Sequence, residues 1–193
     1  MFMSNNIEKL GYDWVIGKSD EIDTASDYYC RTRDIFQARL NRMIDNLLTS
    51  GNIKEEKVYL VSAVTGEIGN NSFDHNLGNW PDVMGTFFAY GFVDSKLKIV
   101  LADRGQGVLK TLKRVKPKLK NDSEALKTAF TERISGRAPE ARGNGLKFSK
   151  ESVEKENMHL IFTSGNARAE LNKEMKIKQI DENIKGCLAI LTV

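Results

Sequence analysis

The chain has few of the residues on which several protein classes depend. Its 193 residues include two cysteines, two histidines and three prolines. Cys30 and Cys187 stand far apart without CxxC spacing, which argues against a structural zinc site and leaves two reduced thiols as the simpler interpretation. No GxxxxGK[ST] phosphate loop occurs, and the segment 105–107 lacks the third glycine of a dinucleotide fingerprint. The usual motifs for binding nucleotides are therefore absent.

Long apolar runs are also missing. No stretch approaches the ~20 apolar residues needed to span a bilayer, and the N-terminus lacks a basic segment followed by an apolar run. We therefore expect neither export nor membrane insertion, and a cytoplasmic location. With 40% hydrophobic and 28% charged residues, the composition is that of a globular protein with one core. The net charge of +3 is too small to predict a nucleic-acid partner.

Hydrophobic periodicity predicts an α+β fold. Apolar residues at helical spacing predict one helix from Phe36 to Leu48, capped near Gly51, and a second helix through Val58 to Ile68. Strand-like runs at 86–93 and 97–102 flank a turn and predict a hairpin, and further strands are expected at 159–163, 168–171 and 187–193. We expect a two-layer α/β sandwich, with helices on one face of a mixed, mainly antiparallel sheet.

The chain is expected to form one domain over residues 22–193. Residues 1–21 show weak periodicity and mixed charge, which suggests an extended N-terminal arm. Within this arm, the apolar residues 14–16 are expected to add a short strand or to cover a sheet edge.

A polar stripe lies on the second predicted helix. Glu67, Asn71 and His75 are each four residues apart, so on a helix they stack along one face. Glu67 can polarise a water molecule. The amide oxygen of Asn71 is a hard ligand, suited to a magnesium ion that takes its other ligands from phosphates and water. Taken alone, this stripe is better explained as the solvated face of an amphipathic helix.

Two glycines follow the predicted strand 97–102. The strand ends in Asp103, and Gly105 and Gly107 come directly after it. A carboxylate at the rim of a sheet can accept a hydrogen bond from an exocyclic amine such as that of adenine. The glycines permit positive φ and a close approach to a flat ring. The alternative is an ordinary glycine turn after a strand.

A third glycine-rich segment opens another predicted helix, which ends near Asn157. It consists of Gly143, Asn144, Gly145 and Leu146. Unpaired N–H groups and the positive end of the helix dipole make such a helix start a natural phosphate site. The three segments together supply a metal ligand, a base reader and a phosphate cradle. They predict a protein that binds ATP with Mg²⁺.

In order and spacing, these segments resemble the motifs of the GHKL superfamily of ATP-binding domains. This superfamily includes histidine kinases, DNA gyrase, heat-shock chaperones, mismatch-repair ATPases and the anti-sigma-factor serine kinases. The resemblance covers residues 35–193. Its N box, ExxxNxxxH, is matched by Glu67, Asn71 and His75; its G1 box, DxGxG, by Asp103, Gly105 and Gly107; and its G2 box, GxGL, by Gly143, Gly145 and Leu146.

The resemblance implies a role for each motif. Asn71 would coordinate magnesium, Glu67 would activate the attacking group or its water, and Asp103 would read adenine. The G2 glycines would bind phosphates. Lys147-Phe148 stands where many relatives have a second Gly-Leu, and Gly186-Cys187 stands where a Gly-Thr pair is usual. Because sulfur is a weak acceptor, we expect the hydroxyl contact near adenine to be lost or to move to residue 163 or 164.

The segment 108–142 is expected to form a mobile lid over the nucleotide. Asn121 and Glu124 predict a capping box for a helix that extends through Ile134 and closes at Gly136. Basic residues crowd the start of this lid, with no acidic residue among them: Arg104, Lys110, Lys113, Arg114, Lys116, Lys118 and Lys120. They can hold triphosphate charge, attract an acidic protein or touch nucleic acid, or they form a solvated loop. No aromatic residues interleave with them, so a platform for single-stranded nucleic acid is not expected.

The two histidines narrow the choice among GHKL activities. One is His75 in the N box, and the other, His159, is followed by Leu160 rather than by an acidic residue. Autophosphorylation on histidine is therefore not expected. The free-standing layout most resembles the anti-sigma-factor serine kinases, which implies a regulatory ATP-binding protein that phosphorylates or sequesters a partner protein. The alternatives are a conformational ATPase that homodimerises on lid closure, with effector domains on another chain, and a nucleotide sensor without turnover.

Overall fold

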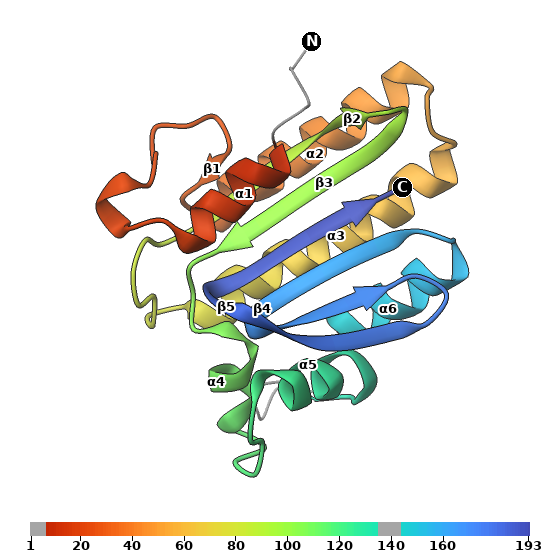
Figure 1. Cartoon of the computed structure of the whole chain (residues 1–193). Coiled ribbons are helices and arrows are strands. Elements are labelled where there is room, and N and C mark those ends of the chain that lie inside the picture. Colours follow the sequence, from red (N-terminus) through yellow and green to blue (C-terminus); the bar gives the residue numbers. More distant parts are fainter. Residues whose placement is uncertain (1–6, 135–143) are drawn as a thin grey trace.

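The computed structural model describes residues 7–134 and 144–193, which form an α+β fold (Figure 1). The helices are α1 (Ile7–Ile16), α2 (Arg33–Ser50), α3 (Glu55–Asn76), α4 (Gly107–Lys113), α5 (Asp122–Thr131) and α6 (Gly145–Lys155), with a 3₁₀ helix at Ser19–Glu21. The strands are β1 (Tyr29–Cys30), β2 (Thr86–Val93), β3 (Lys96–Asp103), β4 (His159–Leu171) and β5 (Met175–Thr192). They form one sheet in the order β1-β2-β3-β5-β4, and every pair of neighbours is antiparallel. The predicted fold class is confirmed.

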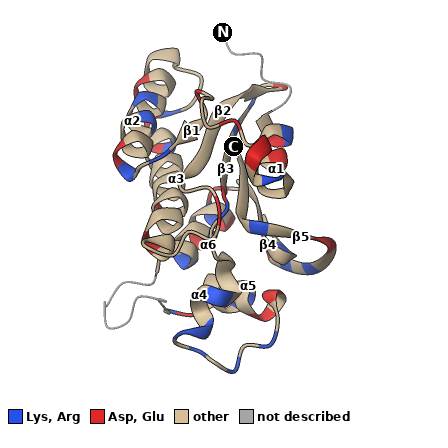
Figure 2. Ribbon diagram, turned by 90° about the vertical axis from the view of Figure 1, so that its left-hand side faces the viewer, with Lys and Arg blue, Asp and Glu red and all other residues tan. Residues whose placement is uncertain are grey.

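Helices lie on both faces of this sheet, whereas the sequence predicted helices on one face only. The helices α2, α3 and α6 cover one face, and the main core lies between them and the sheet (Figures 1 and 2). The helix α1 packs on the opposite face, while α4 and α5 lie together at one end. No helix in the described part of the chain has the length and apolarity required to cross a membrane.

The helix α1 replaces part of the extended arm that the sequence suggested. Ile7, Trp14 and Val15 are buried in a second core together with residues of β2, β3 and β5. Gly11 permits this packing, because a Cβ atom there would overlap the side chain of Val100. Residues 1–6 lie outside the described chain.

The predicted helix pair and hairpin form where the local signals indicated. Gly51 adopts φ 65° and donates its N–H to Leu48, which caps α2 as expected. Asp94 and Ser95 also have positive φ, as a tight two-residue hairpin turn requires, and they join β2 to β3. The predicted Asn121 cap of α5 is confirmed, because its side chain accepts a hydrogen bond from Glu124 N.

The C-terminal ribbon differs most from expectation. The two strands predicted at 159–163 and 168–171 are one strand, β4, and β5 begins at 175 instead of 187. Both strands change register or direction near Gly165 and Gly186, which have positive φ. The part of β4 after Gly165 then folds back beside the part before it, so that Glu170 lies 3.0 Å from His159 Nε2. Helix α5 also differs, since it ends at residue 131, and the predicted stop at 136 lies outside the described residues.

Helices α2 and α3 touch closely at one glycine. The Phe36 ring, fully buried, lies against Gly69, where an added Cβ would overlap the ring. One turn earlier on α3, a Cβ at Gly66 would meet only Leu40 Cδ2 at 3.4 Å, an ordinary contact. The spacing of the two helices therefore depends on residue 69 and not on residue 66.

These two glycines provide a matched test of the packing. We expect Gly69→Ala to lower the free energy of unfolding by about 1–3 kcal/mol, because the new methyl group must displace the Phe36 ring. The control Gly66→Ala should be neutral or stabilising by up to about 1 kcal/mol, because alanine favours helix. Urea unfolding of both variants measures the difference. Equal stability of the two variants would contradict this account of the helix interface.

Candidate functional site

The three glycine-rich or polar segments meet at one cavity of about 500 Å³. It is lined by α3 and α4, by strands β3, β4 and β5, by one residue of α5 and by the first turns of α2 and α6. Of the residues predicted to form the site, the lining includes Glu67, Asn71, His75, Asp103, Gly107, Asn144, Gly145 and Leu146. Gly105 is buried directly behind this wall, and Gly143 lies outside the described residues. Tertiary folding therefore brings together segments that are distant in the sequence.

The stripe on α3 faces the start of α6. A Cβ atom at Gly145 would overlap Glu67 Oε2 and would lie 3.5 Å from Asn71 Nδ2. The start of α6 therefore lies close to both side chains, and a larger residue at 145 would require the flexible Glu67 carboxylate to move. Glu67 is nevertheless exposed and Asn71 is partly exposed, so this end of the cavity is open to water. A carboxylate and an amide thus stand beside the N-terminus of α6, where backbone N–H groups are free of helical partners.

Asp103 forms the buried end of the cavity. Its side chain accepts hydrogen bonds from Ser72 Oγ at 2.9 Å and from Gly105 N at 2.8 Å, and a third comes from the backbone of Cys187. Burial raises the pKa of this carboxyl to about 6, although the three hydrogen bonds oppose the rise. A carboxylate offers about four lone-pair sites. One acceptor site therefore remains for a donor in the cavity.

The loop after Asp103 is held against the end of α3. Asn76, buried, accepts a hydrogen bond from Gln106 N at 2.8 Å and donates to the carbonyl of Ser72 at 2.7 Å. Gly105 packs directly on this amide, and a Cβ there would overlap it. Gly107 adopts φ 74° and begins α4. Both glycines of the segment are therefore required by the backbone, for close approach at 105 and for positive φ at 107.

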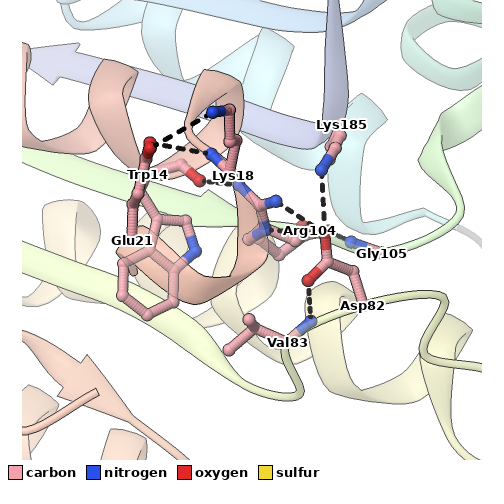
Figure 3. A network of polar contacts seen from close by, with 9 residues as sticks. Trp14, Lys18, Glu21, Asp82, Val83, Arg104, Gly105 and Lys185 are labelled. Atoms are coloured by element: carbon pink, nitrogen blue, oxygen red, sulfur yellow. Dashed lines mark hydrogen bonds and ion pairs between the residues drawn. The ribbon is translucent and has the colours of Figure 1, made fainter. Parts of the chain in front are cut away.

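Arg104 anchors the same loop from the opposite face of the sheet (Figure 3). Its guanidinium, fully buried, donates to the carbonyl of Trp14 at 2.5 Å and to Asp82 at 2.6 and 3.2 Å. Lys185 also contacts Asp82 at 3.0 Å. Burial favours the neutral acid, but hydrogen bonds from Arg104, Ser19 and Lys185 outweigh it and hold the pKa of Asp82 well below its usual range. Arg104 thus belongs to a buried ion-pair network rather than to the basic cluster of the lid.

The hydroxyl groups of Thr163 and Ser164, near the buried end of the cavity, already have hydrogen-bond partners. Ser164 Oγ accepts from Val108 N and donates to the carbonyl of Gly186, each at 3.0 Å, and it is fully buried. Thr163 is buried as well and contacts Arg168. Neither side chain lines the cavity, whereas Cys187 does. Burial, followed by the neighbouring Asp103 carboxylate, raises the pKa of the Cys187 thiol well above its usual value. This wall therefore presents a neutral thiol.

The expected lid contributes apolar walls. Val108, Leu112, Ala129 and Ile134, from α4, α5 and the segment after α5, all line the cavity. The basic residues of this region lie mainly on α4 and on the connection to α5 (Figure 2). Two of them are engaged, since Lys116 pairs with Glu132 at 2.6 Å and Arg114 donates to Gln106 at 2.6 Å. Residues 135–142 of the predicted lid lie outside the described chain.

Sequence reasoning missed several residues that organise the site. Ser72 and Asn76 lie four apart on α3, beside the predicted stripe, and this spacing was the available signal. The sequence carries no local signal for Asp82 or Arg33, because each pairs with a residue from a distant segment. Among the described residues, no group of three or more His, Cys, Asp or Glu could hold a metal ion.

Comparison with known proteins adds no identification. No protein-family model matches this chain, and no curated protein matches it either. What the cavity can bind follows from its lining. One end is apolar and buried with a single available acceptor, and the other is open, with an amide, a carboxylate and a helix N-terminus.

The raised pKa of Asp103 predicts how stability depends on pH. Below about pH 4 this carboxyl is protonated in both the folded and unfolded states, and between about pH 4 and 6 only the folded state keeps the proton. The contribution of Asp103 to stability is therefore full at low pH and declines as pH rises through 6. Relative to Asp103→Asn, the parent should lose about 2–3 kcal/mol between pH 4 and pH 7.

Chemical denaturation at a series of pH values measures this difference. Asp45→Asn, an exposed substitution on α2, controls for the change in net charge. Parallel stability curves for the parent and Asp103→Asn would show that this carboxyl does not titrate near pH 6.

Proposed function

We propose that the chain is a magnesium-dependent ATP-binding regulatory protein of the GHKL type. In this proposal it acts on a partner protein, as a serine/threonine kinase or by ATP-dependent sequestration. The observation that carries the proposal is the convergence of Glu67 and Asn71, Asp103 and Gly145 on one cavity of about 500 Å³. Each lies at the end of the cavity where its predicted chemistry requires it.

The buried end suits adenine. Leu101, Phe162 and Ala189 supply apolar walls for a flat ring, and Asp103 retains one acceptor site. An exocyclic amine can donate to that site, whereas the carbonyl of guanine would place an acceptor against a carboxylate. With a pKa of about 6, Asp103 is mostly ionised at neutral pH and can accept this hydrogen bond.

The open end suits phosphates and a metal ion. The N-terminus of α6 offers N–H groups without helical partners, and Gly145 adds no side chain of its own beside them. Magnesium prefers oxygen ligands and keeps several waters, so the Asn71 amide oxygen together with phosphate oxygens would be an adequate set. Magnesium, when bound, would neutralise phosphate charge and polarise the terminal phosphoryl group. Glu67, exposed beside Gly145, would orient the attacking hydroxyl or water and accept its proton.

The type of turnover distinguishes this proposal from its alternatives. His159 lies on β4 beside Glu170 and does not line the cavity, which supports leaving histidine autophosphorylation aside. The protein should be incubated with γ-labelled ATP and magnesium, with and without the protein encoded by a neighbouring gene. Label on the partner supports the kinase. Free phosphate supports a conformational ATPase, for which ATP-dependent dimerisation is the next measurement, and ATP binding with neither product supports a sensor.

Base selectivity tests the role of Asp103. The parent should bind ATP much more tightly than GTP. Asp103→Asn should weaken ATP binding by about 10–100-fold, because a charge-assisted hydrogen bond to the amine is worth roughly 1.5–3 kcal/mol. Calorimetric titration at pH 7.5 measures both effects, with Asp45→Asn as the control for charge. If GTP competes as well as ATP, Asp103 does not read the base.

A substitution of Glu67 distinguishes an effect on the chemical step from an effect on ATP binding. Glu67→Gln should lower single-turnover rates by about 10²–10⁴-fold and leave ATP affinity within a few-fold, because a general base acts mainly in the transition state. Glu56→Gln, an exposed substitution on the same helix, should alter neither quantity. Parental turnover in the Glu67 variant would remove Glu67 from the proposed mechanism.

A further inference from the structure

The lining of the cavity carries more negative than positive side chains, although the ligand proposed above is an anion. The described lining contains three carboxylates, those of Glu67, Asp74 and Asp103, and a single permanent cation, Arg33. The many lysines of the α4 region do not line it. A triphosphate carries several negative charges, and one metal ion at Asn71 cannot balance both these and the carboxylates. A protein cation at the phosphate end is therefore needed, and Arg33 is the one that the described lining offers.

Arg33 occupies a position that local structure does not favour. It is the first residue of α2, immediately after the Thr32 N-cap. A cation at the N-terminus of a helix is repelled by the helix dipole, so helix stability does not explain an arginine here. Its side chain is 47% exposed and pairs with Asp74, which is 14% exposed. Because Asp74 is mostly buried, the pair offsets the cost of burying that carboxylate, while the half-exposed guanidinium also lines the cavity.

Contacts between α2 and α3 place Arg33 beside Asp74, which lies three residues beyond Asn71 on α3. Gln37, one turn further along α2, donates to Asn70 on α3 at 2.9 Å. Arg33 contacts Asp74, one turn further along α3 than Asn70. Two successive turns of α2 are thus in register with two successive turns of α3. Asn71, the expected magnesium ligand, lies on α3 between Asn70 and Asp74.

From this placement, which rests on the proposed function, we infer that Arg33 binds the phosphate chain of the nucleotide. In the absence of nucleotide it is held by Asp74, and on nucleotide binding it transfers at least one N–H group to a phosphate oxygen. The planar guanidinium suits this exchange, because its five donors can contact a carboxylate and a phosphate together. Asp74 is then a positioning residue that keeps the arginine at the cavity and competes with the phosphates for it.

Titrations with a series of adenine ligands test this role. Adenosine, AMP and ATP with magnesium should be titrated calorimetrically into the parent, Arg33→Gln, Arg33→Lys and the control Arg42→Gln, an exposed arginine of α2 outside the cavity lining. Arg33→Gln should weaken ATP binding about 10–100-fold and leave adenosine within about twofold, because only the phosphates lose a charge-assisted contact. Arg33→Lys should recover part of the loss for ATP, and Arg42→Gln should match the parent.

A substitution of Asp74, the ion-pair partner of Arg33, should change ATP affinity in the opposite direction. Asp74→Asn keeps the size of the side chain but removes its charge, so it should strengthen ATP binding about two- to tenfold. If the pair mattered only for the architecture of the cavity, both Arg33→Gln and Asp74→Asn would weaken adenosine and ATP alike. That pattern, or parental ATP affinity in Arg33→Gln, would overturn the inference. Thermal melts of each variant confirm that the fold is kept.

The outcome for the parent separates this inference from the proposed function. A parent that fails to bind ATP with magnesium overturns both. A parent that binds ATP, together with an Arg33→Gln variant that binds it equally well, overturns the role of Arg33 alone.

Discussion

The site depends on a close contact between the loop after β3 and the bend of β5, where two positions leave no room for a side chain. At Gly105 a Cβ atom would overlap the Asn76 amide, and at Gly186 it would overlap the Asp103 carbonyl. The end of α3, the end of β3 and the bend of β5 can meet only because both residues are glycines. This contact places the Asp103 carboxylate, and through it the buried end of the cavity. Every other feature of the site is arranged around that position.

Successive side chains at the end of β3 point to opposite faces of the sheet, so the same loop has contacts on both faces. Asp103 points toward the cavity and α3. Arg104 points toward α1 and donates hydrogen bonds to Asp82 and to the Trp14 carbonyl. A buried ion pair of this kind contributes little net stability, but the loss of either partner would leave a buried charge without compensation. The network therefore fixes one arrangement of the loop. The helix α1, although it precedes the segment that resembles the GHKL superfamily, is part of the structure that supports the cavity.

Burial divides the cavity into two chemical environments. At one end, Asp103 is buried and Cys187 is partly buried, so the pKa of the carboxyl rises to about 6 and the pKa of the thiol lies well above its usual value. At the other end, Glu67 and Arg33 are exposed and can exchange partners with a ligand or with water. In the proposed function, the buried end receives the ring of the nucleotide and the open end receives its phosphate chain. The two ends are connected by α3, which supplies residues to both.

The sequence by itself determined the local elements and the chemical nature of the site. The 3.6-residue periodicity, the Gly51 and Asn121 caps and the turn at 94–95 were sufficient for α2, α3, α5 and the β2–β3 hairpin, because these signals act within a few residues. Tertiary structure alone decided what depends on distant partners: the position of α1 on the far face, the pairing of segment 175–186 and the contacts of Asn76 and Arg33. Periodicity indicates which face of an element is buried, but not what covers it. Within 175–186, Met175 and Ile177 alternate with lysines and pack against the core, but the rest of the segment is mainly polar, and the bend at Gly165 and Gly186 decides how it pairs.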